Sequence, residues 1–257
     1  MPLLDPEGRR HWREYRQPAA VIMAGVLTVV AFGLVVQNTA DRGEEPRASA
    51  PAAGEPSQQL PIPLPTAAGS PSFTPVDSIA IERVPIASRI DLAARGTIDW
   101  VHWGEQGRFS LERKAGGGFS ILEGTPTEPR NRLTAGPQRY AWTGGEPLAA
   151  SSGATSGIGT CGSGHGFTLS APAGIQQNTL TLYVGATKAR GRLRVELSTG
   201  GDIVTDVWGS RGESMATTAY VISYRASATG KISVKWITAS TYDENCGGVA
   251  LQAATLS

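Results

Sequence analysis

The feature that most constrains this chain is an unbroken apolar run near its start, residues 19–36, with the sequence AAVIMAGVLTVVAFGLVV. The run contains no charged residue, and Thr28 is its only hydroxyl. At about 1.5 Å per residue, a helix of this length spans roughly 27 Å, close to the hydrocarbon thickness of a bilayer. The sequence therefore predicts a single transmembrane helix over residues 18–37, which makes the membrane the first expected partner.

Positive charge gathers in the tail of residues 1–17, where four arginines precede the apolar run (Arg9, Arg10, Arg13 and Arg16). By the positive-inside rule this predicts a cytoplasmic N-terminus and an extracytoplasmic remainder at the cell membrane. The alternative is a cleaved signal peptide, which has a shorter apolar core and a small-residue cleavage site. The best such site, at residues 38–40, has Asn38 at a position that requires a small residue, so we expect an uncleaved signal anchor.

A proline-rich stretch follows the predicted helix. Residues 40–77 hold 8 of the 17 prolines, with alanine, glycine and serine between them. Such a composition buries too little apolar surface to offset the entropy of ordering, and proline favours extended polyproline II. We expect residues 38–77 to form a disordered stalk that separates the following domain from the bilayer.

From residue 78 onward the apolar residues recur with a period of two, as in TIDWVHWG (97–104), TLTLYVG (179–185) and GRLRVELS (191–198). About ten such short segments are separated by glycine-rich and proline-rich turns, which is typical of a β-sandwich. We therefore expect an all-β, antiparallel, two-sheet β-sandwich of jelly-roll type over residues 78–257. Segments 179–185 and 191–198 look like the two strands of a hairpin.

Alternation also predicts which side chains face the core of the sandwich. These are Leu180, Leu182, Val184, Leu193, Val195, Leu197, Ile232, Val234, Trp236, Val249 and Leu251.

Charge argues against nucleic acid as a partner. Residues 78–257 hold 17 Lys/Arg and 14 Asp/Glu. A nucleic-acid-binding domain usually has a stronger basic bias.

The two cysteines, Cys161 and Cys246, both lie in the predicted extracytoplasmic domain. In an oxidising compartment two such thiols usually pair, so we expect a disulfide between them, the alternative being two free thiols. A metal site is not expected, because His102 and His165 lack ligand spacing to the cysteines. Calcium beside Asp243 and Glu244 is an open alternative, since hard cations prefer oxygen ligands, but no known calcium-loop pattern supports it.

Catalysis is not expected. Asp99, His102 and Glu105 occur together in DWVHWGE, but alternation along a strand directs Asp99 and His102 to opposite faces. The serine-hydrolase elbow, the zinc-protease motif and the phosphate-binding loop are all missing from the sequence. We interpret His102 chiefly as a hydrogen-bonded structural residue.

Aromatic residues are abundant for one sandwich, and flat rings can stack on the faces of sugars. The ten tryptophans and tyrosines that follow the stalk are Trp100, Trp103, Tyr140, Trp142, Tyr183, Trp208, Tyr220, Tyr224, Trp236 and Tyr242. The alternative is that most of these rings fill the core. The candidate ligand-binding residues are Trp103, His102, Trp142 and Trp208, of which Trp208 is the one most expected to be exposed.

Four cations, Lys188, Arg190, Arg192 and Arg194, occupy alternate positions around a glycine. On a strand they form a basic strip that could meet an anionic wall polymer or lipid. The alternative interpretation is that these charges protect an edge strand from aggregation.

Several motifs together resemble a recurrent bacterial secreted β-sandwich module found in surface and carbohydrate-active proteins. They are IDLAARGTIDWVHWG, RKAGGG, YAWTGG, LTLYVGA, ISYRASATG and VALQAATL, between residues 88 and 257. The resemblance implies a galactose-binding-like fold and carbohydrate binding without catalysis. This chain lacks the catalytic partner domain of those larger proteins and has its own predicted anchor.

Together these features predict a membrane-anchored, extracytoplasmic module that binds a cell-wall or surface glycan. The alternative is a structural or protein-interaction subunit of a cell-envelope complex.

Overall fold

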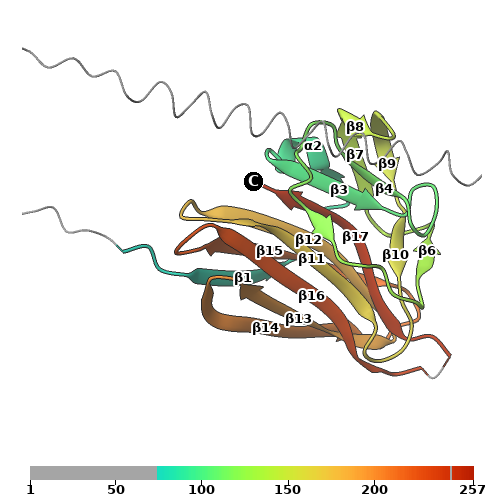
Figure 1. Cartoon of the computed structure of the whole chain (residues 1–257). Helices are drawn as coiled ribbons and strands as arrows, with labels where there is room; N and C mark the ends of the chain where they lie inside the picture. Colours follow the sequence, from blue (N-terminus) through green and yellow to red (C-terminus); the bar gives the residue numbers. More distant parts are fainter. Residues whose placement is uncertain (1–73, 244) are drawn as a thin grey trace, which may run out of the picture. The chain divides into compact units, whose positions relative to one another are not determined.

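The structure, a computed structural model, describes residues 74–243 and 245–257 (Figure 1). The predicted tail, the predicted transmembrane helix and nearly all of the predicted stalk lie outside these residues. Within the described part of the chain, no helix has both the length and the apolar character needed to cross a membrane.

The described residues form an all-β structure with one short helix, as the two-residue period predicts. The elements are β1 (Ser78–Val84), β2 (Arg89–Asp91), α2 (Leu92–Arg95), β3 (Asp99–Trp103), β4 (Leu111–Lys114), β5 (Leu122–Glu123), β6 (Asn131–Leu133), β7 (Arg139–Thr143), β8 (Gly145–Glu146), β9 (Ala150–Ala154), β10 (Gly157–Gly159), β11 (Gly166–Ala173), β12 (Asn178–Thr187), β13 (Ala189–Leu197), β14 (Gly200–Ser210), β15 (Ala216–Arg225), β16 (Gly230–Thr241) and β17 (Gly248–Leu256).

Two sheets form the sandwich. The larger has nine strands, ordered β1-β15-β12-β17-β3-β4-β8, with β10 and β6 attached beside β17. The smaller has five strands, ordered β14-β13-β16-β11-β5. Both are antiparallel, as predicted.

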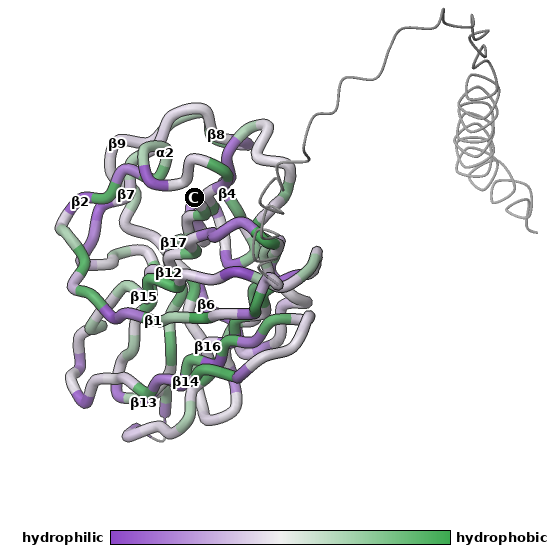
Figure 2. Tube along the Cα trace, turned by 90° about the vertical axis from the view of Figure 1, so that its left-hand side faces the viewer, coloured by the Kyte–Doolittle hydropathy of each residue, from purple (hydrophilic) through white to green (hydrophobic). Residues whose placement is uncertain are grey.

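The main core lies between these two sheets. All eleven residues predicted to face inward belong to it. Hydrophobic and hydrophilic positions alternate along β13 and β16 (Figure 2), because each of these strands has one buried and one solvent-facing side. Close packing in this core also explains Gly191, where an added Cβ would overlap the ring of Trp236.

The far side of the larger sheet carries a cap that the two-sheet prediction did not include. A three-stranded sheet, β2-β7-β9, packs there with α2 over a second apolar cluster. Helix α2 begins where Asp91 accepts a hydrogen bond from the Ala94 amide (3.1 Å) and ends at Gly96. Figure 1 shows α2, β7 and β9 near the top of the molecule and β13 and β14 at the bottom.

Because the larger sheet is covered on both faces, two of its neighbouring strands, β17 and β3, are buried at every position. All nine residues of β17 and all five of β3 are buried. The two tryptophans of β3, Trp100 and Trp103, are therefore both buried, although they lie on opposite faces of the strand.

The predicted hairpin is wrong. Strand β12 pairs with β15 and β17, whereas β13 pairs with β14 and β16 in the other sheet. Lys188, with a positive φ of 45°, is the single residue between β12 and β13, where the chain passes from one sheet to the other. The edge-protection interpretation of the arginines also fails, because β13 is an interior strand of its sheet.

Candidate functional site

Three of the four predicted ligand-binding residues lie in the interior. His102, Trp103 and Trp142 are 0%, 1% and 2% exposed. Trp103 packs in the main core and donates its indole N–H to Glu123 (2.8 Å), whereas Trp142 belongs to the cluster under the cap. Their rings therefore offer no free face to a sugar, and their expected role in an exposed stacking surface is wrong.

Trp208 differs from the other three because it is half-buried on β14, an edge strand of the smaller sheet. Its ring stacks on Trp236, with centroids 6.5 Å apart and planes at 30°. One face of Trp208 is thus used in packing against the core.

His102 is a buried, neutral imidazole. Its ring lies between those of Tyr140 and Trp142, with centroid distances of 5.2 and 5.1 Å. Among the described residues, neither ring nitrogen has a hydrogen-bond partner. Burial lowers the pKa of His102 from 6.5 to about 3, because the positive charge would lose its hydration. The main chain of Ser156 partly opposes this lowering of the His102 pKa.

Asp99 lies on the other face of β3, as alternation predicts. Its carboxylate accepts hydrogen bonds from the amides of Trp100 (2.9 Å) and Ile121 (2.8 Å). Burial raises its pKa, and the guanidinium of Arg113, 3.8 Å away, offsets part of this effect. Asp99 and His102 therefore do not converge on one catalytic centre.

Burial of His102 predicts a loss of stability in acid. Between pH 6.5 and about 3 the unfolded chain binds a proton at this imidazole and the folded chain does not, so the free energy of unfolding falls as the pH falls. We expect His102→Leu to remove up to about 1.4 kcal/mol per pH unit from this slope, measured by urea denaturation from pH 6.5 to 4. Asp99, whose pKa is raised by burial, contributes to the pH dependence of stability with the opposite sign. This contribution is the same in the variant and in the wild type, so it cancels when their slopes are compared.

Tyr140→Phe is the matched control for this experiment, because it alters the same cluster and keeps the imidazole. It removes the hydroxyl that donates to Gln252 (3.2 Å), so it should lower stability while preserving the acid slope. An unchanged slope in His102→Leu would contradict the assignment.

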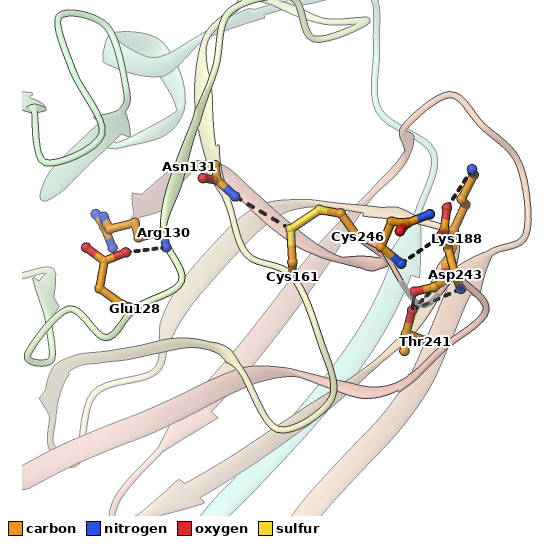
Figure 3. Close-up of a disulfide and its surroundings, with 9 residues drawn as sticks. Glu128, Arg130, Asn131, Cys161, Lys188, Thr241, Asp243 and Cys246 are labelled. Carbon is orange, nitrogen blue, oxygen red and sulfur yellow. Dashed lines mark hydrogen bonds and ion pairs between the residues drawn. A yellow bond between two sulfur atoms is a disulfide. The ribbon is translucent and has the colours of Figure 1, made fainter.

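The predicted disulfide is confirmed. Cys161 follows β10 and Cys246 precedes β17, and the bridge joins the two loops with their Cα atoms 4.8 Å apart (Figure 3). In the same region the Lys188 ammonium contacts the Asp243 carboxylate at 2.7 Å.

The calcium alternative stays untested. The hydrogen bond from Lys188 lowers the pKa of Asp243, so that carboxylate already has a cationic partner. Glu244 lies outside the described residues. No group of three or more His, Cys, Asp or Glu side chains arranged to hold a metal occurs within 74–243 and 245–257.

A cleft of about 400 Å³ opens beside the disulfide. Strand β6 with the two residues after it and the ends of β10, β12 and β17 line the cleft. Its lining residues are Asn131, Arg132, Leu133, Thr134, Ala135, Gly159, Thr160, Cys161, Thr187, Met215, Cys246, Gly248, Val249 and Ala250.

The chemistry of this cleft is mainly uncharged. Its walls combine the apolar side chains of Leu133 and Met215 with hydroxyl, amide and main-chain groups. The guanidinium of Arg132 is held against the main chain, with Nε donating to the carbonyl of Gly104 (2.6 Å). No Asp, Glu or His is among the described residues that line it.

Sequence reasoning missed this cleft. Its walls come from segments that are far apart in the chain, and among its residues only the two cysteines and Val249 had been singled out, Val249 as a core residue. Its polar groups are ordinary threonines, glycines and an asparagine, which carry no motif.

Comparisons with known proteins leave the family open. No family model matches the chain, and no curated protein matches it. A family 6 carbohydrate-binding module studied for its binding sub-sites has 17% identity and a TM-score of 0.29, with 54% of this chain and 93% of that chain covered.

Two further solved structures are similar to the same degree. CsCBM6-3 from Clostridium stercorarium, in complex with cellobiose, has 20% identity and a TM-score of 0.27. The match covers 54% of this chain and 93% of the CsCBM6-3 chain. TmCBM61, in complex with β-1,4-galactotriose, has 10% identity and a TM-score of 0.25 and covers 53% and 86%. At these values the likeness assigns neither a ligand nor a site to this chain.

Proposed function

We propose that the described domain is a non-catalytic binding module that holds a neutral glycan in the cleft beside Cys161–Cys246. The observation that carries this proposal is the lining of the cleft, which mixes apolar side chains with uncharged hydrogen-bonding groups and, within residues 74–243 and 245–257, contains no carboxylate or imidazole. A sugar presents the same mixture, since C–H faces alternate with hydroxyls. The volume of about 400 Å³ lies within the range of small-molecule sites.

The disulfide supports this proposal because it ties together two loops of the cleft rim. Cys161 and Cys246 both line the cleft, and β10 and β17 pair directly beside them. A rim held in one arrangement loses less conformational entropy on binding than a flexible one does. The site would therefore be largely formed before the glycan arrives.

The test uses the full chain on a glycan array, followed by titration of the best ligand. Ala135 is exposed and lines the cleft, so Ala135→Trp should fill the cleft and weaken binding at least tenfold without disturbing the core. Ala228→Trp is the matched control, because Ala228 is exposed between β15 and β16 and does not line the cleft. Equal affinity of the two variants would refute the site.

A role in protein binding is the second candidate. Phe109 and Phe119 are 57% and 64% exposed on either side of β4, and each ring lies beneath an arginine guanidinium. Exposed rings of this kind are frequent in protein interfaces. A chain that binds no sugar on the array, and is crosslinked through a photoreactive residue at position 119 to one envelope protein, would favour this alternative.

We further propose that residues 19–36 anchor the module in the cell membrane, with the domain outside the cytoplasm. The hydropathy of that segment and the charge of residues 1–17 support this location. The Cys161–Cys246 bridge is also typical of an oxidising compartment. Fractionation of cells that express the full chain, with protease added to one side of the membrane, tests both parts of the proposal.

A further inference from the structure

The outer face of the five-stranded sheet carries a dense row of cations. Arg190, Arg192 and Arg194 occupy alternate positions on β13, so their side chains project from the same face, about 6.8 Å apart. Lys231 and Lys235 project from this face on the neighbouring strand β16. We name these five residues the basic face. Arg190, Arg192 and Lys231 are exposed, so the face is open to solvent.

The charge of the basic face is poorly compensated. Arg194 lies directly opposite Lys235 in the sheet register, an arrangement of like charges that destabilises a sheet. In the described part of the chain, the carboxylate that contacts them is that of Glu196, 2.8 Å from Arg194 and 3.9 Å from Lys235. Within the described residues, no carboxylate lies within 4 Å of Arg190 or Arg192. An anionic partner would supply the missing charge.

Hydroxyl groups are interleaved with these cations. Thr205 lies across from Arg194 on one side, and Thr168 lies across from Lys235 on the other. Ser233 and Ser170 form the next pair along the face. The described residues that lie directly across from Arg190, Arg192 and Arg194 are Gly209, Ser240, Val207, Ile237, Thr205 and Lys235. None of these is aromatic, so they do not form the stacking platform that single-stranded nucleic acid uses.

We propose that the basic face binds a linear polysaccharide whose repeating units carry carboxylate or phosphate groups. The cations contact the anionic groups, and the serine and threonine hydroxyls contact the sugar hydroxyls between them. None of the five cations lines the cleft, so this site is independent of the neutral-glycan site proposed above. The two sites would let one module hold a neutral chain and an anionic chain together.

The test measures binding of the full chain to polygalacturonate, with dextran as the uncharged probe, over a series of salt concentrations. We expect binding to polygalacturonate alone, weakening as salt rises, because charge attraction drives the association. Arg190→Gln with Arg192→Gln should weaken binding roughly tenfold at low salt. Arg89→Gln with Arg225→Gln is the matched control, since it removes the same charge from exposed positions outside the five-stranded sheet.

A second variant should change the affinity for polygalacturonate in the opposite direction. Glu196→Gln removes the carboxylate between Arg194 and Lys235, so it should strengthen binding to polygalacturonate by a few-fold, a result that misfolding cannot produce. The proposal is overturned if binding is absent at low salt, if the control pair weakens it equally, or if only anionic vesicles or single-stranded DNA bind. Ala135→Trp should leave this binding unchanged, which separates it from the cleft.

Discussion

Replacement of Trp236 by alanine should lower the free energy of unfolding by about 3–5 kcal/mol. The ring is 1% exposed and lies in the main core, where it contacts Trp208 (6.5 Å between centroids) and Tyr220 (5.7 Å). It also fills the space above Gly191, which has no side chain of its own. Loss of the ring therefore removes its buried apolar contacts with Trp208 on β14 and Tyr220 on β15, and it leaves a cavity.

Urea denaturation of the full chain, followed by circular dichroism, measures this change. Trp208→Ala is the graded comparison, because its ring is half-buried at the sheet edge and its loss should cost clearly less. A loss below about 1 kcal/mol for Trp236→Ala would show that the ring does not pack as described.

Removal of the disulfide is the second large effect. Cys161→Ser with Cys246→Ser opens a loop of 85 residues, which the chain-entropy model values at about 4 kcal/mol. We expect the double variant to unfold at correspondingly lower urea concentration. Because both cysteines line the cleft, glycan affinity should fall as well.

A reducing agent provides the control for this experiment. It should lower the stability of the wild type towards that of the double variant and leave the double variant itself unchanged. If the reduced wild type kept its full stability, the bridge would contribute nothing to the fold.

Much of the sandwich could be predicted because alternation is a local property. Leu193, Val195 and Leu197 had to share one face of their strand whatever the strand paired with, and the structure buries all three. The cysteine pairing could also be predicted, from the compartment and the number of thiols. The pairing of β12 and β13 could not, since both strands have the same pattern and nothing local identifies their partners.

Whether the aromatic residues are buried or exposed could be decided only from the three-dimensional structure. A strand with tryptophan at positions 100 and 103 has a ring on each face, and the sequence leaves open whether both faces are covered. The cap of β2, β7, β9 and α2 covers the second face, so Trp100, His102 and Trp142 are buried beneath it. Sequence reasoning predicted a two-sheet sandwich and therefore left these residues available to a ligand.

By itself the sequence determined the all-β character of residues 78–257, the side chains that face the main core and the pair of cysteines, because these follow from a period of two and from residue type. Tertiary structure alone decided the pairing of the strands, the burial of β3 on both faces, the cleft beside the disulfide and the open sheet face on which the predicted row of arginines lies. Each of these depends on contacts between segments that are distant in the chain, and a local pattern carries no information about which distant segment will lie against it.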